Sequence, residues 1–116
     1  MHTLYVPPQR GSTHYCENEM NDKQKEVMLI AQEECAEVIQ AISKVFRFGM
    51  DDVHPTTNKS NKDSLEEEVG DLMCMLELMQ EHGIVNSINV LNANVRKRNK
   101  LKKWSSIFNN EPEIIN

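Results

Sequence analysis

The strongest constraint on the fold of this chain is the spacing of its apolar residues. From about Asp22 to Phe48 and again from Ser64 to His82, apolar residues recur at intervals of three and four, as on one face of a helix. No segment shows the strict alternation of apolar and polar residues that indicates a strand. The spacing therefore predicts an all-α fold. The two stripes comprise Ala31, Cys35, Val38, Ile42 and Val45, and then Leu65, Val69, Leu72, Leu76 and Met79.

Local signals mark where these two helices begin and end. Gly49 follows the first stripe and predicts a left-handed C-terminal cap. The polar segment 50–62 contains a proline and is predicted to be a loop. Ser64, followed three residues later by Glu67, has the spacing of a capping box, so we expect the second helix to run from about Ser64 to His82.

A third helical pattern begins near Asn86 or Ser87 and ends at Trp104. It carries a spaced apolar stripe into a strongly basic C-terminal half. Because cations near a helix C-terminus favour the helix dipole, this alone accounts for part of the basic cluster. We therefore expect three main helices. The third stripe comprises Ile88, Leu91 and Val95, and the basic half extends from Arg96 to Lys103.

The domain organisation follows from the parts without a period. Residues 1–18 and 105–116 are predicted to be irregular tails, with room for a short fourth helix at either end. We expect a single domain over 1–116 with its core at about 22–104. A helical chain of 116 residues buries only a modest share of its surface. We therefore expect an oligomeric helical bundle, a homodimer or a homotetramer.

Composition excludes several classes of partner. The net charge is −5 and the pI is about 5.3, so binding of nucleic acid through bulk electrostatics is disfavoured. Three cysteines, an odd number without metal-ligand spacing, are typical of a reducing compartment. No apolar run is long enough for a signal peptide or a bilayer span. The expectation is a cytoplasmic protein without nucleic-acid or membrane partners.

Acidic residues of the first helix fall on both sides of the boundary between apolar and polar faces. At 100° per residue, Glu34 falls inside the apolar arc and Glu37 lies at its margin. Glu26 and Glu33 fall outside it and are expected to be solvated. Glu34 therefore points where packing would place an apolar side chain.

The second helix repeats this arrangement. Glu68 and Asp71 fall within its apolar arc, whereas Glu66 and Glu77 point away. Carrying ionised carboxylates into a partly buried seam costs several kcal/mol each unless something compensates. No Lys or Arg occupies the same arcs. A bound cation is the better explanation, and hard oxygen ligands favour Mg²⁺, with Mn²⁺ as a substitute.

In order and spacing, these acidic residues resemble a known family. Glu33, Glu34 and Glu37, followed by Glu68 and Asp71, are similar to the EExxE and ExxD motifs of the MazG-like all-α NTP pyrophosphatases. The superfamily also includes dimeric dUTPases, dCTP pyrophosphatases and phosphoribosyl-ATP pyrophosphatase. The likeness covers about residues 25–104.

The resemblance implies hydrolysis of a nucleoside or deoxynucleoside triphosphate to the monophosphate and pyrophosphate, and hence a role in nucleotide-pool control. It implies that Glu34, Glu37, Glu68 and Asp71 are metal ligands, with two or three ions once substrate is bound. Glu33 matches a glutamate that acts on the attacking water in some members. Because the helical wheel places Glu33 outside the apolar arc, Glu34 and a metal-bound hydroxide are competing choices.

Basic and amide side chains supply candidate contacts to the substrate phosphates. Lys97 and Lys100 stand where related proteins carry basic residues, and Asn94 lies on an apolar arc where its amide needs a partner. Lys44 and Arg47, at the end of the first helix, are further candidates.

Two other functions compete with the pyrophosphohydrolase. One is a non-catalytic helical module whose acidic seam binds a structural cation or a protein partner. The other is binding of RNA or DNA through the basic third helix, which the acidic overall charge disfavours. These residues leave dUTP, dCTP, GTP or dGTP and a broad activity open as alternatives for the base and sugar preference. The compact form and the composition, rich in Asn and Lys, suit a bacterial or phage protein.

Overall fold

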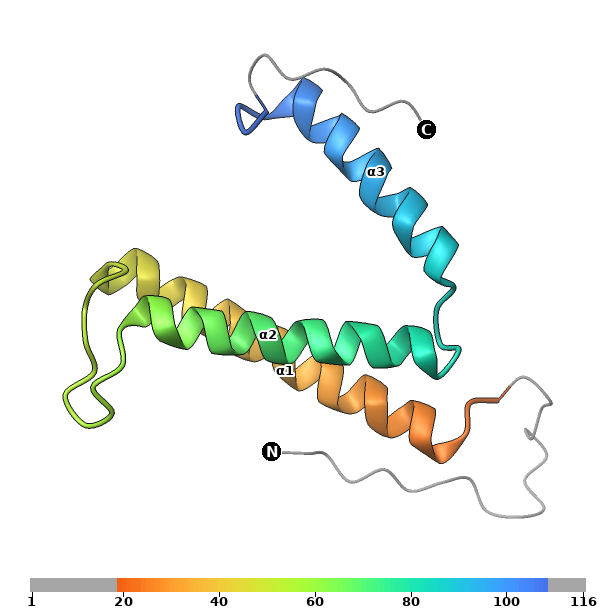
Figure 1. The fold of residues 1–116 in the computed structure, drawn as a ribbon, viewed down its shortest axis with the longest axis horizontal. Coiled ribbons are helices and arrows are strands. Elements are labelled where there is room, and N and C mark those ends of the chain that lie inside the picture. Colours follow the sequence, from red (N-terminus) through yellow and green to blue (C-terminus); the bar gives the residue numbers. More distant parts are fainter. Residues whose placement is uncertain (1–18, 109–116) are drawn as a thin grey trace. The chain divides into compact units, whose positions relative to one another are not determined.

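The computed structural model describes residues 19–108, and these form three helices without a β-strand (Figure 1). The helices are α1 (Asp22–Phe48), α2 (Asn61–Glu81) and α3 (Ser87–Trp104). The predicted all-α class is confirmed. Expectations about a short fourth helix within 1–18 or beyond residue 108 lie outside the described residues. Among the described helices, none combines the length and apolar character needed to cross a bilayer.

Helix α1 has the bounds that the sequence predicts. Asn21 caps its start: Gln24 donates its backbone N–H to Asn21 Oδ1 at 2.8 Å, and Asn21 donates its own N–H to Gln24 Oε1 at 3.0 Å. Gly49 ends the helix with φ 90° and ψ 161°. The positive φ is as expected, but ψ is extended, so the left-handed helical cap is not adopted. This region of backbone space is open almost only to glycine.

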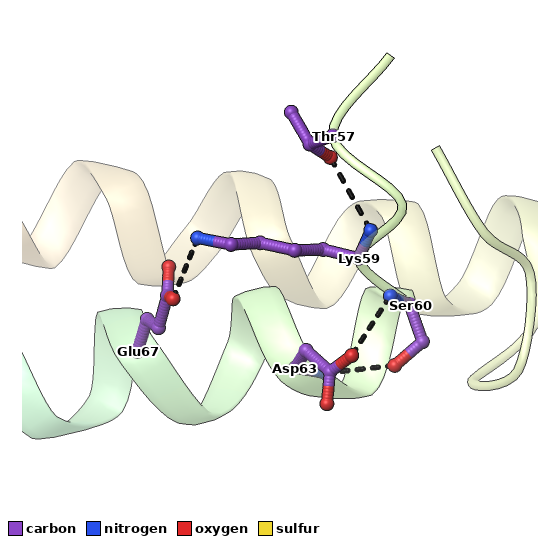
Figure 2. Close-up of polar contacts among 5 residues, drawn as sticks. All are labelled: Thr57, Lys59, Ser60, Asp63 and Glu67. Carbon is purple, nitrogen blue, oxygen red and sulfur yellow. Dashed lines mark hydrogen bonds and ion pairs between the residues drawn. The ribbon is translucent and has the colours of Figure 1, made fainter. Parts of the chain in front are cut away.

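Helix α2 begins three residues earlier than the sequence indicates. Its N-cap is Ser60, whose hydroxyl accepts the backbone N–H of Asp63 at 3.0 Å, while Asp63 Oδ2 accepts the backbone N–H of Ser60 at 3.0 Å (Figure 2). The prediction of a start at Ser64 was wrong because Ser60 and Ser64 each precede an acid by three residues, so the sequence offers two candidate caps. A hydrogen bond from the loop favours the earlier start, because the N–H of Asn61, the first residue of the helix, donates to the carbonyl of Asp52.

The α1 and α2 helices form an antiparallel pair that is tied at both ends (Figure 1). The side-chain amide of Gln24, near the start of α1, donates to the carbonyl of His82 after α2 at 2.8 Å. The side-chain amide of Asn61, at the start of α2, donates to the carbonyl of Gly49 after α1 at 2.8 Å. These two bonds fix the register of the pair.

The core between α1 and α2 is small. Among the described residues, only four hydrophobic side chains are buried, and all four lie on this pair. Burying a Val or Met side chain contributes about 1.5–3 kcal/mol, so little apolar stabilisation comes from within the pair. The buried residues are Val27, Ala31, Ala41 and Met75.

Helix α3 belongs to a second compact unit, which begins at Gly83. Its N-cap is Asn86, whose Oδ1 accepts the N–H groups of Ile88 and Asn89 at 2.9 and 3.0 Å. None of its residues is buried. At its C-terminal end, the guanidinium of Arg98 lies 5.8 Å from the ring centroid of Phe108. The boundaries predicted for this helix are confirmed.

Candidate metal centre

Three carboxylates from two helices converge on one place along the α1 and α2 pair. One oxygen from each of Glu34, Glu68 and Asp71 lies within 4.8 Å of the others. Glu34 comes from α1, and Glu68 and Asp71 from α2. The sequence predicted that these three side chains would face one another, and the structure brings them together.

The helices place these acids by their spacing from core residues. Glu34 lies three residues after the buried Ala31, and Asp71 lies four residues before the buried Met75. Residues three or four apart share one face of a helix, so both acids stand beside the packed seam. Glu68 lies one turn before Asp71, on the same face. The antiparallel pairing of α1 and α2 then brings the two sets of carboxylates together.

The cluster lies at the edge of the seam rather than within it. Glu34 and Glu68 are half-buried, whereas Asp71 is exposed. The helical wheel placed Asp71 inside the apolar arc, which is only partly right because the narrow core does not extend to its carboxylate. An open edge allows a substrate to approach while two of the three acids stay partly shielded from water.

The surroundings of Glu68 disfavour its charged form. Partial burial raises the pKa of its carboxyl above the ordinary value of 4.5, and the charges of Glu37, Asp71 and Glu34 raise it further. Glu37 is exposed and lies outside the group of three, yet its charge has the largest effect of these neighbours. Glu37 therefore lies at the rim of the cluster, as its marginal position on the helical wheel predicted.

The donor set suits a hard divalent cation. All the converging atoms are carboxylate oxygens, the ligands that Mg²⁺ prefers. Oxygens on opposite sides of one Mg²⁺ stand roughly 4.2 Å apart, from a metal–oxygen distance of about 2.1 Å. The observed limit of 4.8 Å needs only small side-chain movements to reach this geometry. A cation would also offset the repulsion that raises the pKa of Glu68.

Glu33 differs from its prediction. The wheel placed it among solvated residues, but the side chain is half-buried and its Oε1 is shielded from solvent. The wheel locates only the Cβ atom, whereas the rotatable bonds of glutamate can carry the carboxylate towards the seam. Glu33 is thus less open to water than the sequence suggested.

A hollow of about 450 Å³ adjoins the cluster under the loop between α1 and α2. Glu68 belongs to both the hollow and the cluster, so the two features form one continuous region. Two lysines face the hollow. One is Lys44, which the sequence analysis named as a substrate contact, and the other is Lys59, which it did not name.

Lys59 pairs with an acid beside the cluster. Its Nζ lies 2.6 Å from Oε1 of Glu67, and the hydrogen bond and charge of Glu67 raise the pKa of Lys59 above its ordinary 10.5 (Figure 2). Because Lys59 lies in a loop, no helical period indicated which way its side chain points.

Of the other predicted contacts, one lies on α1 and three lie on α3. Arg47 is exposed, does not line the hollow, and stacks over Phe48 with 5.0 Å from its guanidinium carbon to the ring centroid. Asn94, Lys97 and Lys100 are exposed on α3, within the second unit. Asn94 Oδ1 accepts a long bond of 3.4 Å from Nε of Arg98, which supplies the partner that its amide was expected to need.

Comparison with known proteins identifies the family. The family described as MazG nucleotide pyrophosphohydrolase domain matches residues 22–105. The chain therefore belongs to the MazG family, as the acidic motifs indicated. This membership supports nucleotide pyrophosphohydrolase activity in general, in a family that generally depends on divalent metals. Searches of curated proteins and of solved structures give no significant match.

Proposed function

We propose that this protein hydrolyses a nucleoside or deoxynucleoside triphosphate between the α and β phosphates, releasing the monophosphate and pyrophosphate. One observation carries the proposal: Glu34, Glu68 and Asp71 converge within 4.8 Å at an open helix edge, in a chain of the MazG family. The hollow of about 450 Å³ beside them offers space for a substrate.

The carboxylates would hold Mg²⁺, or Mn²⁺ in its place. Glu34, Glu68 and Asp71 are the proposed ligands, and Glu37 at the rim completes the set of four. When bound, such ions neutralise phosphate charge and lower the pKa of a coordinated water. Two or three ions fit the proposal once substrate oxygens share the coordination. The half-buried positions of Glu34 and Glu68 limit competition from bulk water.

Activation of the attacking water falls to Glu33 or Glu34. Glu33 is adjacent to a proposed ligand, and its half-buried carboxylate carries an oxygen shielded from solvent. A general base must lie within hydrogen-bond reach of the water, and its carboxylate must not be occupied in coordinating the metal. If Glu33 is the base, Glu33→Gln lowers kcat and leaves metal affinity unchanged, whereas Glu34→Gln reduces both. Equal loss of metal affinity in the two variants would assign both residues to the metal.

Phosphate binding is assigned to basic and amide side chains. Lys44 has the strongest support because it lines the hollow that also contains Glu68. Arg47, Asn94, Lys97 and Lys100 remain proposals from the sequence, and all four are exposed. Removing one phosphate contact raises KM while kcat changes less, because the interaction is present in both ground and transition states.

We also propose that the protein is a homodimer or homotetramer. Only four hydrophobic residues of the described chain are buried, and large apolar side chains such as Ile39 (65 % exposed) and Phe46 (85 % exposed) face outwards on α1. Exposed apolar surface of this kind favours association. Sedimentation equilibrium should give a mass of two or four chains, and a stable monomer would contradict the proposal.

The activity is tested with a panel of the eight common NTPs and dNTPs in the presence of Mg²⁺ or Mn²⁺. The expected product from at least one of them is pyrophosphate, and the panel also reports base and sugar preference. Release of orthophosphate alone would contradict the proposal. Cation-dependent stability with no turnover of any nucleotide would instead favour a non-catalytic metal-binding module.

A further inference from the structure

The loop between α1 and α2 holds the backbone of Lys59 in a defined position. The carbonyl of Lys59 accepts the N–H of His54 at 2.8 Å, and the N–H of Asn58 reaches back to the carbonyl of His54 at 2.9 Å. Asn58 adopts a left-handed conformation with φ 59°, which turns the chain at this point. Ser60 then begins α2. The base of the Lys59 side chain is therefore fixed at the edge of the hollow.

The charged end of Lys59 is less firmly held. Its ion-pair partner is Glu67, at 2.6 Å, and the two side chains are 46 % and 54 % exposed. Ion pairs in such exposed settings contribute about 0–1 kcal/mol, because water competes for both charges. The ammonium can therefore exchange Glu67 for another anion at small cost.

The position of this pair relates it to the cluster. Lys59, Glu67, Lys44 and Glu68 all line the same hollow, and Glu68 is one of the three converging carboxylates. Because the hollow adjoins Glu68, it offers space next to the cluster for part of a polyphosphate. Glu67 would repel it there, whereas the two lysines would attract it.

We propose that Lys59 binds a phosphate oxygen of the substrate and exchanges its ion pair with Glu67 for that contact. The inference rests on the proposed function, since it assumes a polyphosphate ligand at the cluster. It makes the two partners of one ion pair act in opposite directions. Lys59 promotes substrate binding, and Glu67 opposes it by competing for the ammonium and by repelling phosphate.

A purely structural ion pair predicts something different. If the pair only stabilises the loop, removal of either partner has the same effect, because the same interaction is lost. Opposite effects from the two halves of the pair therefore separate a substrate contact from a loop support.

The test measures binding of inorganic pyrophosphate with Mg²⁺ by calorimetry, using the full chain and its variants. Lys59→Gln is expected to raise Kd about tenfold, the loss of one charge-assisted hydrogen bond. Lys59→Arg should retain most of the affinity. Glu67→Gln should lower Kd a few-fold, and an unchanged Kd in this variant would contradict the proposed competition. Lys62→Gln is the matched control, because it removes an equal charge from an exposed lysine that does not line the hollow.

An unchanged Kd in Lys59→Gln would overturn the inference, as would weaker binding in both Lys59→Gln and Glu67→Gln. Absence of pyrophosphate binding by the unmodified protein would also overturn it. Circular dichroism and thermal midpoints show whether each variant folds. Binding of pyrophosphate does not require turnover, so opposite effects in a protein that hydrolyses no nucleotide would contradict the proposed function while supporting Lys59.

Discussion

The carboxylate cluster and the adjoining hollow share Glu68 but arise from different kinds of structure. Glu34, Glu68 and Asp71 lie on helices, where each side chain direction follows from its place in the 3.6-residue period. The hollow is lined partly by loop residues such as Lys59, whose direction depends on turns and individual hydrogen bonds. The comparison indicates that the acidic charge proposed to bind metal and the basic charge proposed to bind phosphate are positioned by different kinds of structure.

The two regions also differ in electrostatic state. The cluster gathers like charges, which raise the pKa of Glu68, whereas the hollow contains a paired lysine and glutamate. Like charges need an external ion to offset their repulsion, while a paired charge can exchange partners. We therefore expect substitutions in the cluster to affect metal binding and turnover, and substitutions in the hollow to affect substrate affinity.

The largest effect is expected from Glu68→Gln. Glu68 belongs to both the cluster and the hollow, and it is a proposed metal ligand. Its loss should therefore lower kcat/KM by roughly a thousandfold, comparable to losing a group that stabilises charge in the transition state. Pyrophosphate release from the preferred nucleotide measures it. Glu66→Gln, on an exposed part of the same helix, is the matched control and should have activity close to that of the unmodified protein. Similar losses of activity in Glu68→Gln and Glu66→Gln would contradict a special role for the cluster, because any surface carboxylate of α2 would then have the same effect.

A smaller effect is expected from Lys44→Gln. This residue lines the hollow and is not one of the proposed metal ligands, so KM should rise about tenfold while kcat falls much less. Steady-state kinetics over a range of nucleotide concentrations separates the two parameters. Lys23→Gln, an exposed position near the start of α1, provides the charge-matched control. A large fall in kcat with constant KM would mean that the hollow takes part in the chemical step.

The boundary between loop and helix gives a third prediction. Ser60→Ala should lower the free energy of unfolding by about 1 kcal/mol, because it removes the N-cap hydroxyl of α2. Ser64→Ala should cost less, since this residue lies inside the helix. Urea denaturation followed by circular dichroism compares the two. A greater loss of unfolding free energy in Ser64→Ala than in Ser60→Ala would instead support Ser64 as the N-cap of α2.

The smallest effect concerns the pH dependence of the metal-free protein. The pKa of Glu68 is raised in the folded state, so the folded state retains a proton that the unfolded state releases. The contribution of Glu68 to stability is therefore greatest below the ordinary carboxyl pKa and declines as pH rises through the raised value. Glu68→Gln should flatten this decline and raise the thermal midpoint near neutral pH. A steeper decline in that variant would contradict the assigned cause.

Helical spacing was sufficient to predict much of this molecule. It gave the bounds of α1 and α3, the convergence of Glu34 with Glu68 and Asp71, and the marginal place of Glu37. Membership of the MazG family confirms the resemblance that the acidic motifs indicated. These features depend on periodicity, which a single sequence records directly.

The rest depended on interactions that no period encodes. The start of α2 at Ser60 is accompanied by loop hydrogen bonds, and Glu33 is half-buried although the helical wheel places it outside the apolar arc. Lys59 pairs with Glu67, eight residues later in the chain, and directly follows Asn58, whose positive φ turns the loop. Each of these depends on local three-dimensional geometry, so residues near the loop were the least predictable part of the site.

The most direct test of the carboxylate cluster is the stoichiometry and affinity of Mn²⁺ binding, measured by electron paramagnetic resonance of the free ion. The unmodified protein is predicted to bind at least one Mn²⁺ per chain at the cluster of Glu34, Glu68 and Asp71. Glu68→Gln should lose this binding and Glu66→Gln should retain it. Equal Mn²⁺ binding by Glu68→Gln and the unmodified protein would contradict the assignment of the cluster as the metal centre.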